Sequence, residues 1–543
     1  MARKIPKRIY PIARVLRSGP WTGMTDTIEP SAARPDRITF AKNCYATATD
    51  LGTSVVGAPG FSLAGTQLGT AGNRVNQWVG QFTTTAGVEK SLRICNGVVS
   101  EYDWSLNTYT SLVTVANFAT ASGAAGLSVS ARVYCLPFND LLVISDGVSK
   151  PWSWNGTAGA GGLTYLSNCP ILYGQPVSYF YKMFGIKAGE RDTMVWSEEG
   201  DLTLGYDTSP YVNAWNFGGP KAEPLVALTA TNDALGVLRP RSTTVVLGAV
   251  AGDFQTAANR SSVSERIGTT SPAGVLVLDE GTVTIDADGR PQFWHKGGGY
   301  SQGQTALWAD CATTVRGIPR ASLVNAQIVA DDAANLIRIG IAEVGQTHPS
   351  LFLLFERTGQ VPNFVGLSDD YTAQRLGTWK DTSGVPRVVH ASIDDGYAYY
   401  HGTPEGTQWD YEFAAGTQSI QHTLTMSALG ADVAEDSYYD RLTLGSTTAE
   451  DLDVTVDVQT PEGITDPVAY TISSDAAGLT WDAEDWDEDD WAGTAIEFHG
   501  SCNVHARGRW ALVRVRHQGL GEQFSLTEAE LEAHRDGREP QVA

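Results

Sequence analysis

The sequence predicts an all-β protein: a β-propeller of about six or seven blades, followed by a C-terminal antiparallel β-sandwich domain and preceded by an extended N-terminal arm. From about residue 88 onward, short runs of Val, Ile, Leu, Tyr and Trp are separated by Gly, Asp, Asn and Ser, which is typical of strands joined by tight turns. One strand–turn–strand pattern recurs along the chain, and helical periodicity is nearly absent.

The composition indicates a folded chain. It has 543 residues, of which 42% are hydrophobic, with 15 Trp and 20 Tyr. The net charge is -23, so tight wrapping of nucleic acid by the body of the protein is disfavoured. The six cysteines are scattered without a C-x-x-C motif, which indicates reduced thiols. No apolar run is long enough for a membrane span or a signal peptide, so we expect synthesis in a cytoplasm and no membrane span.

The N-terminal segment is basic. Its first 17 residues contain no acid, and Pro6 and Pro11 are incompatible with a regular helix. We therefore predict an extended arm over residues 1–20, which is either a solvated tail or a segment that docks on an acidic neighbour or on nucleic acid. Its basic residues are Arg3, Lys4, Lys7, Arg8, Arg14 and Arg17.

Residues 21–415 are predicted to form the propeller. A unit of about four short strands cannot bury both of its faces alone, so successive copies must stack, most simply as radial blades. A two-sheet sandwich array is the structural alternative. The copies recur roughly every 40 to 70 residues. They include SLRICNGVVSEYDW (91–104), DLLVISDGVSKPWSW (140–154), GTVTIDADGRPQFW (281–294) and LFLLFERTGQVPNF (351–364).

Residues 416–543 are predicted to form the separate β-domain. Strict alternation over longer strands, as in DLDVTVDVQTPEG, is typical of a half-buried antiparallel sandwich. The final LTEAELEAHRDGREPQVA has high helix propensity, but it is equally compatible with a strand followed by a polar tail.

An acidic loop interrupts this domain in the segment WDAEDWDEDDW. Its carboxylates repel one another unless they are solvated or neutralised. The loop is either an exposed segment pinned by its tryptophans, a hard-cation site, a dock for a basic partner arm, or a surface that repels nucleic acid. Its acidic residues are Asp482, Glu484, Asp485, Asp487, Glu488, Asp489 and Asp490.

Catalytic signatures are missing from the sequence. There is no Walker loop, no G-x-S-x-G, no H-E-x-x-H and no dinucleotide fingerprint. In HGSCNVH, strand alternation would place Cys502 opposite His499 and His505, which disfavours a metal site. We therefore predict no enzymatic activity, no catalytic residue, no cofactor and no metal.

Several segments resemble propeller proteins of tailed-phage virions, namely the tail-nozzle, hub or head-to-tail stabilisation proteins of short-tailed phages. The segments are NCYATATDLGTSVVGAPGFSLAG, VALTATNDALGVLRPRSTTVVLGAVAGDF, ERIGTTSPAGVLVLDEGTVTIDADGRPQFWHK and HARGRWALVRVRHQGLGEQFSLTEAELEAHRDGRE. Within them, Arg239 and Arg241 match a basic strand of the pattern, and Arg507 and Arg509 match its late R-G-R turn.

The resemblance implies a structural protein of the virion tail that forms a ring, typically a homohexamer. Such a ring continues the DNA channel below the portal and adaptor, retains the genome and lets it exit without sequence-specific binding. Implied partners are adaptor or portal-side tail proteins and tail fibre or spike proteins. In such a ring we expect residues 1–17 to become ordered by reaching a neighbour's loop 482–490 or the acidic face of the protein above.

Two other functions are compatible with the sequence. One is a receptor- or glycan-binding propeller at the tail tip, with Trp152, Trp154 and Trp409 as sugar platforms. The other is a glycosidase-like propeller enzyme, which would depend on paired carboxylates.

Overall fold

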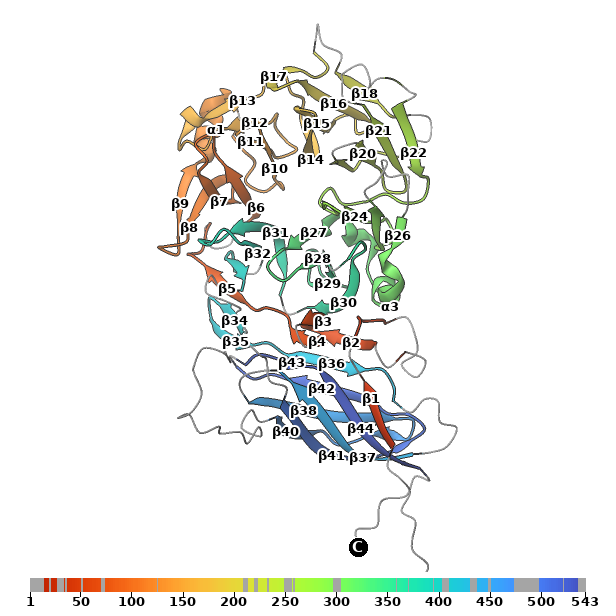
Figure 1. Ribbon diagram of the computed structural model, residues 1–543. Helices are drawn as coiled ribbons and strands as arrows, with labels where there is room; N and C mark the ends of the chain where they lie inside the picture. The colour runs from red at the N-terminus through yellow and green to blue at the C-terminus, as the bar shows by residue number, and fades with distance from the viewer. Residues whose placement is uncertain are drawn as a thin grey trace, which may run out of the picture.

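Figure 1 shows the computed structural model, a ring of small sheets joined to a β-sandwich. The structure describes residues 14–18, 21–26, 34, 37–49, 52–69, 74–124, 126–208, 213–218, 223–231, 234–248, 256, 259–295, 304–357, 359–369, 371–393, 395–402, 410–429, 437–447, 451–472, 498–520 and 522–535.

The first four blades follow one another along the chain, and their strands lie side by side in sequence order, except that the last strand of blade 3 pairs with its third strand. Blade 1 contains β6 (Asn76–Thr83), β7 (Glu89–Cys95), β8 (Val98–Asp103) and β9 (Thr108–Val113). Blade 2 contains β10 (Tyr134–Phe138), β11 (Leu141–Ser145), β12 (Trp152–Trp154) and β13 (Leu163–Tyr165). Blade 3 contains β14 (Leu172–Tyr179), β15 (Lys182–Lys187), β16 (Thr193–Glu198), β17 (Asp201–Gly205) and β18 (Ala214–Asn216). Blade 4 contains β19 (Ala227–Ala230), β20 (Ala234–Leu238), β21 (Thr243–Leu247) and β22 (Arg260–Ser264).

Three further blades complete the ring. Blade 5 contains β23 (Val275–Val277), β24 (Gly281–Ile285), β25 (Pro291–His295) and β26 (Gln304–Ala306). Blade 6 contains β27 (Gln327–Asp331), β28 (Leu336–Ile341), β29 (Leu351–Glu356) and β30 (Asn363–Ser368). Blade 7 contains β31 (Ala373–Lys380), β32 (Pro386–Ser392), β33 (Ala398–His401), β5 (Phe61–Ala64), β34 (Asp410–Phe413) and β35 (Gly416–Ser419).

The ring closes through a strand from the beginning of the chain. In blade 7, β5 pairs antiparallel with β33, so that Ala64 faces Ala398 and Phe61 faces His401. The innermost strands β6, β10, β14, β19, β23, β27 and β31 contact one another in that order, and β31 contacts β6. The predicted all-β propeller is therefore confirmed, and the strands that the structure describes form seven blades.

Tight turns connect the strands within each blade. The Asn96–Gly97 turn between β7 and β8 has positive φ at both residues, 49° and 75°, as a type I′ hairpin requires. Short helices lie between blades, namely α1 (Val115–Ser122), η4 (Leu307–Cys311), α3 (Ala312–Arg316) and η5 (Arg320–Asn325). The short helix η2 (Ala160–Gly162) lies within blade 2, between β12 and β13. In α1, a capping box at Thr114 and Asn117 satisfies the first backbone amides.

The second body is a sandwich. One sheet has the order β1 (Arg14–Ser18), β44 (Glu528–Arg535), β37 (Ser437–Ser446) and β41 (Phe498–Gly508). The facing sheet contains β2 (Ile38–Lys42), β36 (His422–Met426), β42 (Leu512–His517), β38 (Leu452–Thr460), β39 (Gly463–Ile464) and β40 (Val468–Ile472). A small sheet of β3 (Cys44–Thr49), β4 (Gly52–Gly57) and β43 (Ser525–Leu526) lies beside them.

The sandwich uses both ends of the chain, which corrects the boundaries that we placed at residues 20 and 415. β2 pairs with β36, and β4 pairs with β43, so residues 38–57 belong to this body and not to the propeller. The apolar residues of these N-terminal strands are covered by strands that come hundreds of residues later. The local sequence of the N-terminal strands therefore does not predict which strands they pair with. At the C-terminus, residues 528–535 form a strand, the second of the two predicted alternatives.

The two bodies share one apolar core. Ile337 and Ile339 of blade 6 belong to the same buried cluster as Leu424, Val456 and Val515 of the sandwich. Backbone pairing also crosses the boundary, because β2 pairs with β30 at Lys42 and Leu367. The propeller and the sandwich are therefore packed as one unit through an apolar interface.

Candidate functional site

The structure describes two of the predicted interface residues, Arg14 and Arg17. Arg3, Lys4, Lys7 and Arg8 lie outside the described residues, and so do the seven acidic residues of the loop 482–490. Arg14 and Arg17 lie in β1, which pairs with β44 of the same chain from Arg14↔Ala533 to Ser18↔Ala529. The Nε atom of Arg17 lies 2.6 Å from Glu530 Oε1.

This pairing corrects the prediction of an extended arm up to residue 20. Residues 14–18 form an edge strand of the chain's own sandwich, where Leu16 packs against the apolar core. The prediction emphasised the basic residues and prolines and gave too little weight to the alternation of Leu16 with Arg17. The part of the predicted arm before residue 14 lies outside the described residues.

The tryptophans proposed as sugar platforms do not face solvent. Trp152 and Trp154 are completely buried in the core between blades 1 and 2. Phe118 of α1 packs edge-on against Trp152, with ring centroids 5.1 Å apart. Their proposed role in glycan binding is therefore wrong, because no ligand can reach their faces. Trp409 lies outside the described residues.

The HGSCNVH segment (499–505) is part of strand β41, as the sequence predicts. Cys502 is opposite Leu442, and His505 Nδ1 lies 2.8 Å from the hydroxyl of Tyr438. Within the described residues, no group of three or more His, Cys, Asp or Glu side chains is arranged to hold a metal ion. No described helix is long and apolar enough to cross a membrane.

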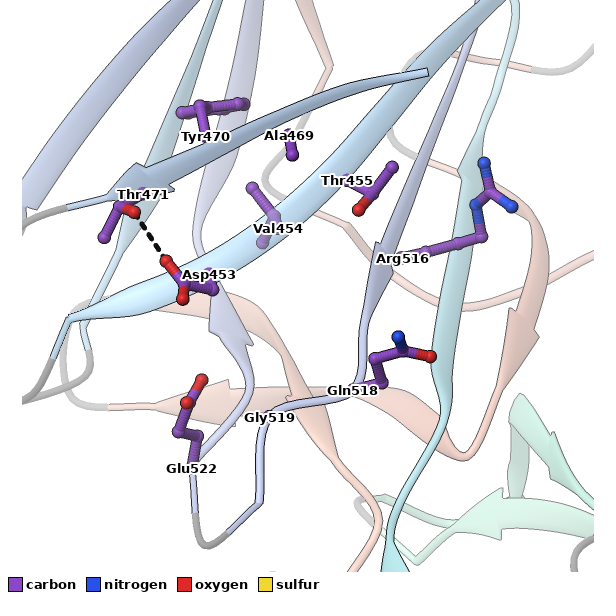
Figure 2. A pocket seen from close by; sticks show the side chains of 10 residues that line it. All are labelled: Asp453, Val454, Thr455, Ala469, Tyr470, Thr471, Arg516, Gln518, Gly519 and Glu522. Carbon is purple, nitrogen blue, oxygen red and sulfur yellow. Dashed lines mark hydrogen bonds between the residues drawn. The ribbon is translucent and has the colours of Figure 1, made fainter.

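The sandwich carries a hollow of about 580 Å³ on the outer face of β38, β40 and β42. Figure 2 shows the carboxylate of Glu522 pointing toward Asp453, with Arg516 on the opposite side. Asp453 accepts a hydrogen bond from Thr471, and Arg516 Nη2 lies 2.8 Å from Asp457 Oδ2. The charged groups around this hollow thus largely have partners within the sandwich.

A different group of side chains lies at one end of the ring formed by the innermost strands. Each blade repeats the same up-and-down strand order, so the first residues of the innermost strands lie at one end. Tyr134 begins β10, Tyr173 is second in β14, and Arg375 is third in β31. Arg132 lies two residues before the first residue of β10, and Arg191 lies in the turn between β15 and β16. We call these five residues the arginine–tyrosine cluster.

Two arginines of the cluster lie over tyrosine rings. The guanidinium carbon of Arg191 lies 3.7 Å from the ring centroid of Tyr173, and that of Arg132 lies 5.1 Å from the centroid of Tyr134. Such cation–π contacts hold the guanidinium groups in place without neutralising their charge. Burial and the neighbouring Tyr134 raise the pKa of Tyr173, with Arg191 and Arg132 opposing the shift, so its phenol is protonated at neutral pH.

The third arginine is buried. Arg375 is 8% exposed, its Nε donates to the carbonyl of Gln77 at 3.0 Å, and its Nη1 donates to the carbonyl of Gln374 at 2.6 Å. Burial, together with the positive charge of Arg132, lowers the pKa of Arg375 to about 9. Arg132 and Arg375 therefore repel each other across the junction of blades 7, 1 and 2.

Sequence reasoning missed this cluster. Its residues are spread from position 132 to 375, and only the closed ring brings them together. The one available signal was the short spacing in ARVY, where an arginine precedes an aromatic residue at the beginning of a strand.

Comparison with known proteins found neither a matching family model nor a matching curated protein. Among solved structures, the chain is similar to BamB from Moraxella catarrhalis, with 11% identity, a TM-score of 0.35, and coverage of 66% of this chain and 94% of that one. It is also similar to PorZ, a bacterial surface component of the type-IX secretion system of Porphyromonas gingivalis. For PorZ the identity is 11%, the TM-score 0.37, and the coverage 67% of this chain and 42% of that one. The sheet order described above, and not these likenesses, identifies the seven blades.

Proposed function

We propose that this β-propeller protein is a non-enzymatic structural component of a phage tail that assembles, as six copies, into a ring of the nozzle or hub. The ring continues the DNA channel, retains the genome and lets it exit during ejection. Adaptor or portal-side proteins on one side and tail fibres or spikes on the other are its neighbours in this proposal. The basis for the phage assignment is the sequence resemblance given above.

The observation that carries the structural role is the apolar core shared by blades 5 and 6 and the sandwich. Phe293 of blade 5, Ile339 of blade 6 and Leu424 of the sandwich are all buried in it. Two domains joined through such a core resist relative motion, whereas domains that close over a substrate usually meet through smaller, more polar interfaces. A rigid two-body subunit suits a wall that withstands the pressure of a packaged genome.

The described side chains also favour a structural role. The thiols of Cys44 and Cys135 are buried, and burial raises the pKa of Cys44 to about 12 and that of Cys135 well above its ordinary value. Neutral, buried thiols are poor nucleophiles. The buried imidazoles of His390 and His422 have their pKa lowered by burial to about 3, which is too low for proton transfer near neutral pH.

The charge of the chain fits a conduit. At a net charge of -23, the body repels the phosphate backbone and would let DNA slide past without firm binding. A basic wall would instead hold DNA through release of counterions. The proposal therefore requires the acidic surface, not the arginine–tyrosine cluster, to line the channel of the assembled ring.

Assembly of the purified full-length chain tests the proposal. Native mass spectrometry and negative-stain electron microscopy, over a range of protein concentration and salt, should detect closed rings with an axial opening. Glycan-array binding and hydrolysis of host polysaccharides are measured on the same preparation. Specific glycan binding or turnover, with no ring under any condition, would contradict the proposal in favour of a tail-tip receptor-binding protein or a glycosidase.

A further inference from the structure

The arginine–tyrosine cluster is an unusual concentration of positive charge in an acidic protein. The chain has 61 acidic and 38 basic residues. Among the described residues, none of the three arginines of the cluster forms an ion pair with an Asp or Glu. The acidic residues nearest in sequence are directed elsewhere: Glu190 pairs with Lys187, and Asp192 accepts from Asn216.

We propose that the arginine–tyrosine cluster binds a phosphate group at this end of the innermost strands, with Arg132 and Arg375 as its direct ligands and Arg191 as a flanking cation. This site goes beyond the proposed role in the tail and does not depend on it.

Free hydrogen-bond donors support this assignment. Arg132 makes no hydrogen bond within the described structure beyond its contact with the Tyr134 ring, so its guanidinium donors are available. Arg375 uses Nε and Nη1 on backbone carbonyls, which holds its Nη2 in a fixed position. The Nε of Arg191 is buried and has no hydrogen-bond partner, while its Nη2 donates to the carbonyl of Leu225 at 3.1 Å. Donors on these arginines are therefore left for an acceptor that comes from outside the chain.

The charge of the cluster favours phosphate over a carboxylate. Three guanidinium groups carry three positive charges, and protonated tyrosines do not offset them. A carboxylate would supply one negative charge, whereas a phosphate monoester or inorganic phosphate supplies about 1.5 to 2 at pH 7. Phosphate also has more oxygen acceptors, which match the donors of several guanidinium groups and of the tyrosine hydroxyls.

The backbone around the cluster is fixed before any ligand arrives. Gln77 donates from Nε2 to the carbonyls of Ser128 and Ala131 at 2.6 and 2.7 Å, which holds the segment that leads to Arg132. Gln374, next to Arg375, accepts at Oε1 from the backbone amide of Asn76 at 2.7 Å. The ligand residues of blades 7 and 2 are thus positioned by side-chain bridges through blade 1, so that binding requires little ordering.

The test uses the full-length chain, inorganic phosphate as the first probe and a short 5′-phosphorylated oligothymidylate as the second. Isothermal titration calorimetry and a tyrosine difference spectrum are recorded at constant ionic strength, with chloride and acetate as comparison anions. We expect phosphate to bind and to perturb the tyrosine spectrum. Equal binding of both probes indicates recognition of the phosphate group itself, and binding of the oligonucleotide alone indicates a nucleic-acid end.

Variants separate binding from folding. Arg132→Gln should weaken phosphate binding at least tenfold, and Arg132→Lys, which retains the charge, should weaken it less. Arg320→Gln serves as the control, because Arg320 is exposed on the propeller and already paired with Asp288 at 2.9 Å. Arg375→Gln removes hydrogen bonds between blades and could prevent folding. The conclusion therefore depends on the comparison of Arg132→Gln with Arg132→Lys. Absence of binding by either probe, or equal binding by wild type and Arg132→Gln, would overturn the proposal, as would tighter binding of acetate than of phosphate.

Discussion

His390 Nδ1 lies 3.2 Å from His401 Nε2, and both imidazoles are buried where β5 closes the propeller. Phe61 of β5 packs against both rings, with centroids 4.7 Å from His390 and 5.9 Å from His401. The strand that closes the ring is therefore held by a cluster of uncharged aromatic side chains. Protonation of either histidine would place a charge in this cluster without a carboxylate beside it.

The first prediction concerns acid stability. Burial lowers the pKa of His390 to about 3 and that of His422 to about 3. The unfolded chain binds these protons near pH 6.5 and the folded chain only near pH 3, so stability is complete above about pH 6.5 and falls as the pH drops toward 3. Each histidine contributes a slope of about 1.4 kcal/mol per pH unit within this window.

Urea unfolding between pH 7.5 and 4 measures this slope. His390→Phe, which keeps an aromatic ring but cannot be protonated, should reduce the slope, and His499→Gln, at an exposed position of β41, is the control substitution. A free energy of unfolding that stays constant from pH 6.5 to 4 would show that these imidazoles are not buried as neutral groups.

The second prediction concerns the contact between the last and first blades. A Cβ atom on Gly377 of β31 would lie 2.2 Å from the carbonyl oxygen of Val79 on β6. Gly377→Ala should therefore force the two innermost strands apart and lower the thermal unfolding temperature, at a cost of about 1–3 kcal/mol or more. Gly161→Ala is the matched control, since a Cβ atom there meets nothing within 4 Å. Equal unfolding temperatures for the two variants would refute the tight packing of β31 on β6.

The third prediction concerns a buried ion pair in blade 6. Arg338 Nη2 lies 2.7 Å from Asp331 Oδ2, and their side chains are 1% and 3% exposed. Asp331→Asn leaves the guanidinium without its counter-charge, and we expect a loss of about 3–5 kcal/mol in unfolding free energy. Asp332→Asn, next in sequence but 46% exposed and paired with Arg357, should change stability by less than about 1 kcal/mol. Chemical denaturation of both variants makes the comparison, and similar losses would argue against burial of the pair.

The fourth prediction concerns the turn between β14 and β15. Phe180 and Tyr181 have φ of 46° and 56°, a left-handed conformation that is unfavourable for bulky residues, and Tyr181 is 68% exposed. Replacing the pair with Asn–Gly should relieve this strain and raise the unfolding free energy by roughly 1–3 kcal/mol. Thermal unfolding of the double variant tests it. A decrease in stability would mean that contacts of the two rings outweigh the backbone strain.

Much of the propeller could be predicted from the sequence because its blades are local. Hairpin turns such as Asn96–Gly97 and the apolar strands beside them specify each blade within a short stretch of chain. The pairing of β5 with β33 and of β1 with β44 could not be predicted, since each joins residues hundreds of positions apart. The sequence of so short a strand does not specify which distant strand it pairs with.

The candidate site escaped prediction for the same reason. Arg132 lies just before an ordinary strand and Arg375 within one, and neither belongs to a motif. Only closure of the ring reveals that they lie near each other and lack carboxylate partners. By contrast, the basic N-terminal segment predicted that Arg17 would contact a neighbouring molecule. Its partner in the structure, Glu530, belongs to the same chain.

We proposed that this two-body chain forms a ring in the wall of a phage tail. Cryo-electron microscopy of intact particles, produced by cells that encode the chain, is the sharpest test of this role. We expect the seven-bladed propeller and its sandwich to fit, as one rigid body, into six equivalent positions around the DNA channel of the tail. Particles whose tail density contains no such ring, or in which the propeller occurs singly at the tip with its faces on a receptor, would contradict it.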